Sequence, residues 1–318
     1  MQASAAPSSD HPEPGAPSAV SIRGLWKHFG TQAAVAGLNL ELPAGSFIGL
    51  VGPNGAGKTT TLSMATGLLR PDQGTVLVHG TDVWADPVEV KARIGILPEG
   101  LRMFERLSGR ELLQYTGRLR GLPGAEVDRR AEELLAVLDL GRDADKLVAD
   151  YSTGMRKKIG LAAALLHNPD VLFLDEPFEG VDPVSAQTIR GVLKRYAAAG
   201  STVVFSSHVM ELVEQLCDWV AVVNAGRVIA QGPLDSVRDG RSLHEAFLDL
   251  IGVREDDGQA LGWLGGGRGG DGPATGGPVA DGPVADGPVA GGPVAGGPVA
   301  GGPVAGGPVG GGQFGGGQ

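Results

Sequence analysis

The N-terminal part of the chain has the hydrophobic pattern of β-strands. Apolar and polar residues from 21 to 42 follow a strand-like pattern around a turn at 30–32, which predicts a pair of antiparallel strands. The fully apolar run at 47–51 predicts a buried strand. After it, Leu62 and Leu68-Leu69 predict a packed helix.

The pattern changes to helical spacing in the middle of the chain. A short helix at about 86–92 and a strand at 94–97 precede this change. Residues 100–168 then contain apolar residues at helical spacing in three stretches, each opening with a plausible capping residue. We therefore predict a helical insertion between strands over about 100–168.

Strands and helices alternate again after the insertion. Such an alternation is typical of an α/β sheet flanked by helices, and a helical extension is expected within 241–264. Strands are predicted at 171–175, 202–207, 219–223 and 227–232, and helices at 183–199 and 209–217.

Both ends of the chain have the composition of disordered segments. Residues 1–18 lack the basic start and the apolar run of a secretory signal. In residues 265–318 a GPVA motif repeats every five residues, which excludes collagen and supplies too few large apolar side chains for a core. We expect one folded domain over 19–240, the extension over 241–264 and a flexible tail.

Composition narrows the class of protein. The net charge of −10 disfavours nucleic acid as the main partner. The single cysteine, Cys217, allows no intrachain disulfide, suits a reducing cytosol and is expected to be buried. No stretch approaches the roughly 18 apolar residues that a membrane span needs. A connection to a membrane would therefore need a partner protein.

A glycine-rich motif after the strand at 47–51 predicts a phosphate-binding loop. The sequence GPNGAGKTT fits G-x-x-x-x-G-K-[ST], in which glycines let backbone N–H groups face phosphates at the start of a helix. The lysine would reach the β- and γ-phosphates, and the first threonine would offer Mg²⁺ a hydroxyl ligand. The predicted nucleotide-binding residues here are Gly52, Pro53, Asn54, Gly55, Ala56, Gly57, Lys58, Thr59 and Thr60.

Two further segments supply chemistry that such a loop needs. The apolar run at 171–174 leads into the acidic pair Asp175 and Glu176. A small polar turn containing Ser152 and Gly154 opens a helix, which offers a hydroxyl and free N–H groups as a second place for a γ-phosphate. Because a helical insertion separates this turn from the loop, the two phosphate-binding segments cannot easily bind one nucleotide within a single chain. We therefore expect a dimer, in which the loop of one chain and the turn of the other bind the same nucleotide.

These motifs resemble those of the nucleotide-binding subunits of ATP-binding cassette (ABC) transporters over residues 19–240. In that family's terms GPNGAGKTT is Walker A, VLFLDE is Walker B, YSTGM is the signature loop and GVDP is the D-loop. The resemblance implies a fold with a P-loop NTPase core of the α/β class, an antiparallel β subdomain and an inserted helical subdomain. It also implies ATP and Mg²⁺ as cofactors.

The resemblance implies a role for each matching residue. Asp175 would hold Mg²⁺, and Glu176 would orient or deprotonate the attacking water. Lys58 and the partner's Ser152 and Gly154 would share the charge on the γ-phosphate. The resemblance implies roles for three further residues. Phe29 would stack on the adenine, Asp182 would join the two sites across the dimer, and His208 would sense the γ-phosphate.

Some residues depart from the family's commonest pattern. Glu99 stands where glutamine is usual and could still reach Mg²⁺ or the attacking water, so we add it to the metal ligands Thr59 and Asp175. The signature reads STGM in place of SGGQ. This combination is reminiscent of subunits serving drug and polysaccharide exporters. The basic run at 156–158 is expected to be a solvated helix face.

The resemblance also implies partners and a location. We expect a separate membrane permease and a second ATPase subunit, most simply in a homodimer, with the chain peripheral on the cytoplasmic face of the membrane. A non-transport ABC-type ATPase is the main alternative. A second alternative is a phosphate-loop kinase or GTPase, although a protein of that class would lack the signature turn.

Overall fold

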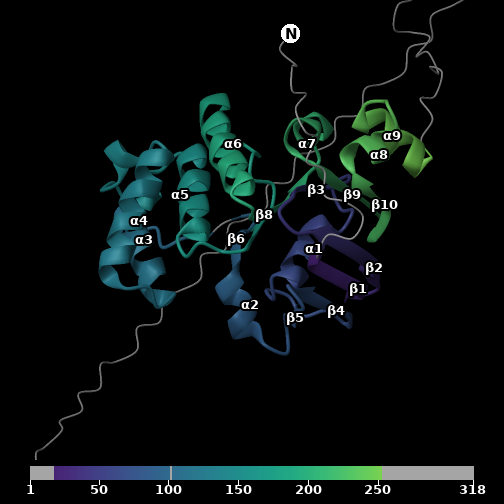
Figure 1. Cartoon of the computed structure of the whole chain (residues 1–318), viewed down its shortest axis with the longest axis horizontal. Coiled ribbons are helices and arrows are strands. Elements are labelled where there is room, and N and C mark those ends of the chain that lie inside the picture. The colour runs from purple at the N-terminus through teal and green to yellow at the C-terminus, as the bar shows by residue number, and fades with distance from the viewer. Residues whose placement is uncertain (1–17, 101, 253–318) are drawn as a thin grey trace, which may run out of the picture. The chain divides into compact units, whose positions relative to one another are not determined.

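The computed structural model describes residues 18–100 and 102–252. The predictions for residues 1–17 and for the repetitive tail lie outside the described residues. Figure 1 shows the arrangement of helices and strands. Within the described ranges, each helix is too short or too polar to span a bilayer.

An antiparallel sheet forms the first layer. Its strands occur in the order β2-β1-β4-β5. The long pair β1 and β2 joins through the turn at Gly30 and Thr31, and β1 also pairs with β4. The bounds are β1 Ser18–Phe29, β2 Gln32–Pro43, β4 Gln73–Val78 and β5 Thr81–Asp82.

A second, mainly parallel sheet carries the loops of interest. Its order is β10-β9-β3-β8-β7-β6, with β10 antiparallel to β9 and every other neighbouring pair parallel. The carboxyl ends of parallel strands meet at one edge, so the loops after β3, β6, β7 and β8 converge there. The bounds are β3 Phe47–Val51, β6 Ile94–Leu97, β7 Val171–Leu174, β8 Thr202–Ser207, β9 Trp219–Asn224 and β10 Arg227–Pro233.

The parallel strands are buried on both faces, which explains their continuous apolar sequences. Successive residues of β7 and β8 enter different cores: Phe173 and Val204 pack with the antiparallel sheet, whereas Leu172 and Phe205 pack with the helices. Burial of apolar surface on both faces, worth about 25 cal/mol per Å², stabilises this central sheet. It is therefore a rigid support for the converging loops.

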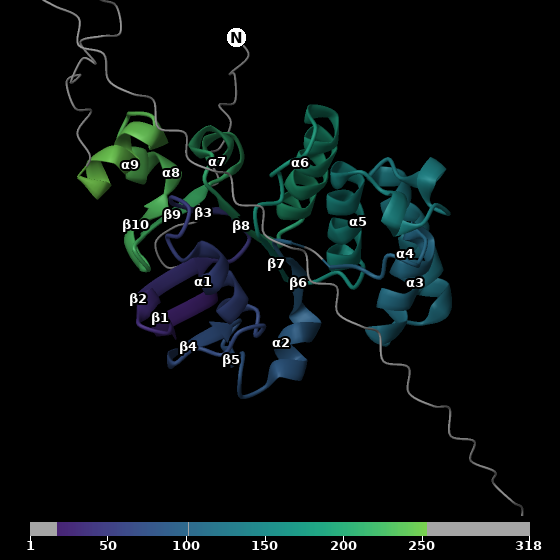
Figure 2. The ribbon, with the colours of Figure 1, turned by 180° about the vertical axis from the view of Figure 1, so that it is seen from behind.

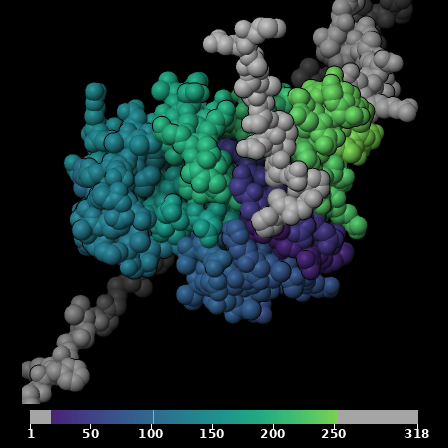
Figure 3. Space-filling view, in the orientation of Figure 1, coloured from purple at the N-terminus to yellow at the C-terminus, as the bar shows by residue number. Residues whose placement is uncertain are grey.

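The helices lie mainly around the parallel sheet. Helices α3 to α5 lie at one end of the unit and α8 and α9 at the other, as the two opposite views and the surface view show (Figures 1, 2 and 3). The bounds are α1 Lys58–Ala65, α2 Pro87–Arg93, α3 Gly109–Leu119, α4 Gly124–Val137, α5 Thr153–Leu165, α6 Pro183–Ala198, α7 Met210–Leu216, α8 Leu234–Arg238 and α9 Leu243–Ile251.

Side-chain caps fix where several helices begin. Ser108 and Glu111 form a reciprocal capping box at α3, as Ser242 and Glu245 do at α9. The Asp182 carboxylate accepts hydrogen bonds from the first N–H groups of α6. These caps place the starts of the helices that border the converging loops.

The predicted α/β architecture, with an antiparallel sheet and helices between β6 and β7, is confirmed. Cys217 is buried, as expected. One helix prediction was wrong: α1 ends at Ala65, so Leu68 does not belong to it and is 59% exposed. The reason is Gly67, whose φ of +71° stops the helix after two turns. The short helix α8 was not predicted.

Candidate nucleotide-binding site

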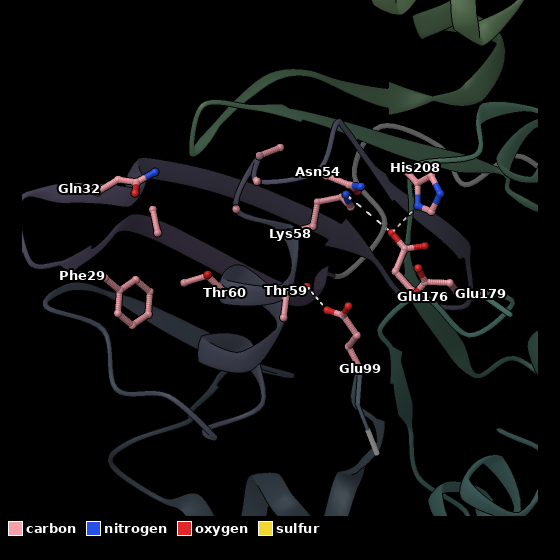
Figure 4. A pocket seen from close by; sticks show the side chains of 14 residues that line it. Phe29, Gln32, Asn54, Lys58, Thr59, Thr60, Glu99, Glu176, Glu179 and His208 are labelled. Atoms are coloured by element: carbon pink, nitrogen blue, oxygen red, sulfur yellow. Dashed lines mark hydrogen bonds and ion pairs between the residues drawn. The ribbon is translucent and has the colours of Figure 1, made fainter. Parts of the chain in front are cut away.

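A cavity of about 380 Å³ opens where the loops after the parallel strands converge. Figure 4 shows Phe29 and Gln32 at one end of it and Glu176, Glu179 and His208 at the other. The lining residues are Phe29, Gln32, Ala34, Asn54, Gly55, Ala56, Gly57, Lys58, Thr59, Thr60, Glu99, Glu176, Glu179 and His208.

The phosphate loop owes its conformation to its glycines. Gly57 has φ +102° and caps α1, and a Cβ there would lie 2.5 Å from the carbonyl oxygen of Ala34. At Gly52 a Cβ would lie 2.1 Å from the carbonyl oxygen of Val223. Gly55, at φ +80°, faces open space. The loop therefore packs tightly on β2 and β9 while its outer side stays open to a ligand.

Lys58 is held within the loop that precedes it. Its Nζ donates to the carbonyl oxygens of Gly52 at 2.9 Å and Pro53 at 3.3 Å, and it lies 3.7 Å from Glu176 Oε1. The side chain is only 6% exposed. A buried ammonium group with two carbonyl partners is a preorganised point charge beside the open face of the loop.

Oxygen atoms of Thr59, Glu99 and Asp175 lie close together at the start of α1. Thr59 Oγ1 lies 3.2 Å from Glu99 Oε2 and 3.2 Å from Asp175 Oδ1. Hydroxyl and carboxylate oxygens are the ligands that Mg²⁺ prefers, and a Mg²⁺ ion keeps further positions for phosphate and water. The donor set therefore fits Mg²⁺ bound together with a nucleotide.

Glu176 is held by groups from several elements. Its Oε1 lies 3.1 Å from Nδ1 of His208, within hydrogen-bond distance. Its backbone N–H donates to Ser206 Oγ at 2.9 Å. The residue has φ +45°, an uncommon conformation for a residue with a side chain. Its carboxylate is only 11% exposed and lies at the inner end of the cavity.

The aromatic end of the cavity is more open. Phe29, the last residue of β1, is 55% exposed, and Gln32 begins β2 across the turn. The exposed ring faces the cavity at the end away from Lys58 (Figure 4). An apolar ring at one end and a cation at the other suit a ligand with a flat base and a phosphate chain.

The signature turn and D-loop lie apart from this cavity. Ser152, Gly154 and Asp182 are not among the residues that line it. Gly154 packs on the D-loop and the start of α6 instead, because a Cβ at Gly154 would lie 2.8 Å from both Asp182 Oδ2 and Ser185 Oγ. Ser152 Oγ accepts from the N–H of Met155 and is exposed. The two predicted phosphate-binding segments, the phosphate loop and the signature turn, therefore lie at separate places in one chain.

Several site residues escaped the sequence reasoning. Ser206 Oγ donates to Asp175 Oδ1 at 2.5 Å, and Glu179 lines the cavity beside Glu176. The basic run at 156–158 is not a solvated face: Lys158 is 4% exposed, and Lys157 donates to the backbone of Glu176. The one available signal for Ser206 was the pair of serines that ends β8, directly after an apolar run.

The fold and the cavity define a class of protein. A glycine-rich loop between a buried parallel strand and a helix, with a buried lysine and with two adjacent carboxylates directly after another strand of the same sheet, is the arrangement of a P-loop nucleoside triphosphatase.

Comparisons with known proteins identify the family. A family model described as ABC transporter matches residues 35–179. The daunorubicin/doxorubicin resistance ATP-binding protein DrrA of Streptomyces peucetius is 42% identical over 67% of this chain and 65% of its own length. The Nod factor export ATP-binding protein I of Ralstonia nicotianae is 38% identical over 76% of this chain and 74% of its own length.

A solved structure agrees with these relatives. The structure of an ATP-binding subunit of an ABC transporter superposes with a TM-score of 0.68 at 29% identity, covering 73% of this chain and 99% of that one. The chain belongs to the ABC transporter family, as an ATP-binding and ATP-hydrolysing subunit.

Proposed function

We propose that this chain powers export of a small molecule through a separate membrane permease. The observation that carries the proposal is the convergence of Lys58, Glu176 and His208 at one end of the cavity, with Asp175 close to the cavity residue Thr59. The direction of transport is supported by the relatives, whose names concern drug resistance and Nod factor export. The subunit would then lie on the cytoplasmic face of the membrane, bound to its permease.

The length of the cavity supports one orientation of ATP. Phe29 would stack on the adenine, and backbone N–H groups within residues 54–60 would bind the phosphates. Lys58 would exchange its contacts with the loop carbonyls for contacts with the β- and γ-phosphates. This exchange costs little, because the ammonium group moves from one set of acceptors to another in the same place.

Metal binding is proposed at the oxygen cluster below the loop. Thr59, Asp175 and Glu99 would hold Mg²⁺, which supplies neutralisation of phosphate charge when bound. Ser206 would keep the Asp175 carboxylate oriented, since its hydroxyl donates to Oδ1. Orienting the ligands in advance reduces the cost of assembling the metal site.

Glu176 is the proposed group that orients or deprotonates the attacking water. Its carboxylate is nearly buried and faces the cavity beyond Lys58 (Figure 4). His208 would hold that carboxylate while ATP is absent and contact the γ-phosphate when ATP is present. Phosphoryl transfer needs such positioning more than it needs covalent help.

A second copy of the chain is the proposed source of the remaining contacts. Ser152 and Gly154 lie outside the cavity of their own chain, so they would meet the γ-phosphate bound by the partner, and Asp182 would link the two sites. Binding of ATP would then bring the two copies together, and hydrolysis would let them part. A homodimer is the simplest form of this assembly.

The permease is proposed to contact the region that follows Glu99. There the exposed rings of Phe104 and Tyr115 meet edge to face at a centroid distance of 5.1 Å, beside an open cavity of about 830 Å³. Exposed aromatic side chains around a hollow suit an apolar partner helix. Closure of the dimer would move this surface together with the metal-binding loop.

The experiment that tests the proposal replaces Glu176 with Gln. ATP hydrolysis should fall by a factor of about 10² to 10³, because the amide cannot accept the proton of the water. With ATP and Mg²⁺ the variant should elute as a stable dimer. Glu211→Gln is the matched control, because it makes the same change at an exposed carboxylate of α7 outside the cavity and should keep the activity. Hydrolysis by Glu176→Gln at the wild-type rate would refute the assignment.

A second measurement separates transport from a non-transport ATPase. The tagged chain, expressed with the membrane protein encoded beside it, should co-purify with that protein in detergent. Replacing Phe104 and Tyr115 with serine should abolish co-purification while leaving ATPase activity of the isolated chain intact. Purification with soluble partners alone would favour the non-transport alternative.

A further inference from the structure

Lys157 connects the signature helix to the loop that carries the acidic pair. It lies in the second turn of α5, and its Nζ donates to the backbone carbonyl oxygen of Glu176 at 2.8 Å. The two residues are 19 positions apart and belong to different elements. Lys157 is not among the residues that line the nucleotide cavity, so its amine reaches Glu176 from behind.

The backbone that Lys157 contacts is in a strained conformation. Glu176 has φ +45°, which costs a residue with a Cβ on the order of 1–2 kcal/mol and persists where neighbouring groups fix it. The same carbonyl also accepts a longer bond, 3.3 Å, from the N–H of Glu179. On the other side of the residue, the N–H is fixed by Ser206. The amine of Lys157 therefore completes the set of contacts that hold this peptide.

The charge of Lys157 also suits its surroundings. Burial lowers the pKa of Lys157, and the attraction of four carboxylates offsets only part of this lowering. Three of these carboxylates line the cavity, Glu179, Glu99 and Glu176, and the fourth, Asp175, lies beside Thr59. Lys58, at the same end, donates instead to a carbonyl oxygen of the phosphate loop. A half-buried ammonium group thus stabilises a cluster of negative charge without occupying space in the cavity.

We propose that Lys157 is a positioning residue for ATP hydrolysis. By holding the carbonyl of Glu176, Lys157 keeps the carboxylate oriented toward the attacking water. Because Lys157 belongs to α5, this orientation then depends on the position of the signature helix. The inference depends on the proposed role of Glu176. A displacement of about 1 Å at such a group costs up to 10²-fold in rate, so losing this contact should lower turnover rather than binding.

The test uses Lys157→Met, which keeps an aliphatic side chain of similar length and removes the donor and the charge. With the full chain, kcat for ATP should fall about tenfold, while KM for ATP stays within about twofold and the urea midpoint is little changed. Lys157→Arg should recover part of kcat, because it restores a charged donor. Lys194→Met, at an exposed lysine of α6, is the matched control and should retain the wild-type rate.

A double-variant cycle decides whether Lys157 acts through Glu176. In the Glu176→Gln background, adding Lys157→Met should cause no further loss of the residual rate. A further tenfold loss in that background, or an unchanged kcat in Lys157→Met alone, would overturn the inference. The proposed function fails separately, since it requires Glu176→Gln itself to be nearly inactive.

Discussion

Ser206 offers a sharp test of how the acidic pair is held. Its hydroxyl accepts from the N–H of Glu176 at 2.9 Å and donates to Asp175 Oδ1 at 2.5 Å, and the residue is 0% exposed. One side chain thus connects both members of the pair to β8. Ser206→Ala removes both hydrogen bonds while changing the volume of the side chain very little.

The expected loss of stability follows from these two bonds. An unpaired buried N–H costs about 1–3 kcal/mol, and a lost hydrogen bond to a charged group about 1.5–3 kcal/mol. Part of this is recovered, because Asp175 Oδ1 also lies 3.2 Å from Thr59 Oγ1. We therefore expect the free energy of unfolding to fall by about 2–3 kcal/mol. Turnover should fall as well, because both carboxylates lose an orienting contact.

The assay is urea unfolding followed by fluorescence, together with steady-state ATPase rates. Ser207→Ala is the matched control: Ser207 is 2% exposed and its hydroxyl accepts one bond, from the N–H of Val209 at 3.0 Å. It should cost about 1 kcal/mol. An m-value equal to that of the wild type would show that the comparison is valid. A loss below about 0.5 kcal/mol for Ser206→Ala, with normal turnover, would refute the reasoning.

Two further predictions follow from backbone and charge. Gly57→Ala should lower the free energy of unfolding by about 3 kcal/mol or more and abolish nucleotide binding, because the added Cβ would clash with the carbonyl of Ala34. The control is Gly80→Ala, which has φ +81° and open space around it and should cost about 1 kcal/mol. Equal losses in the two variants would contradict the argument. His167 is half-buried, and this burial, reinforced by Arg120, lowers its pKa to about 4. The unfolded chain therefore binds more protons between about pH 6.5 and 4, and stability should drop by about 1–2 kcal/mol as pH falls through this window. Thermal melts should show a smaller drop for His167→Gln, and an identical drop would disprove the assignment.

The parts of the site that lie within one short segment could be predicted from the sequence. The phosphate loop needs its glycines for its own backbone, so its position between β3 and α1 followed from local pattern alone. The acidic pair was recognisable because four apolar residues lead into it. His208 was placed by its position after the apolar strand at 202–207 and by the order of the motifs.

The contacts between segments could not be predicted in this way. Ser206 reaches the acidic pair because β8 lies between β3 and β7, and no pattern within a strand reveals its neighbours. Lys157 was expected to be solvated, because three successive basic residues on a helix give no indication of which one faces inward. Leu68 was assigned to α1 because an apolar residue after a glycine still fits helical spacing.

The separation of Ser152 from the cavity of its own chain has a kinetic consequence. In the proposed dimer a single polypeptide is only half an enzyme, so the rate at low concentration should grow with the square of the amount of protein. Dilution would abolish the ATPase activity of the purified subunit while the subunit is still folded. Fusing two copies in tandem would convert the reaction to first order in polypeptide, and a permease that holds two subunits side by side would have the same effect.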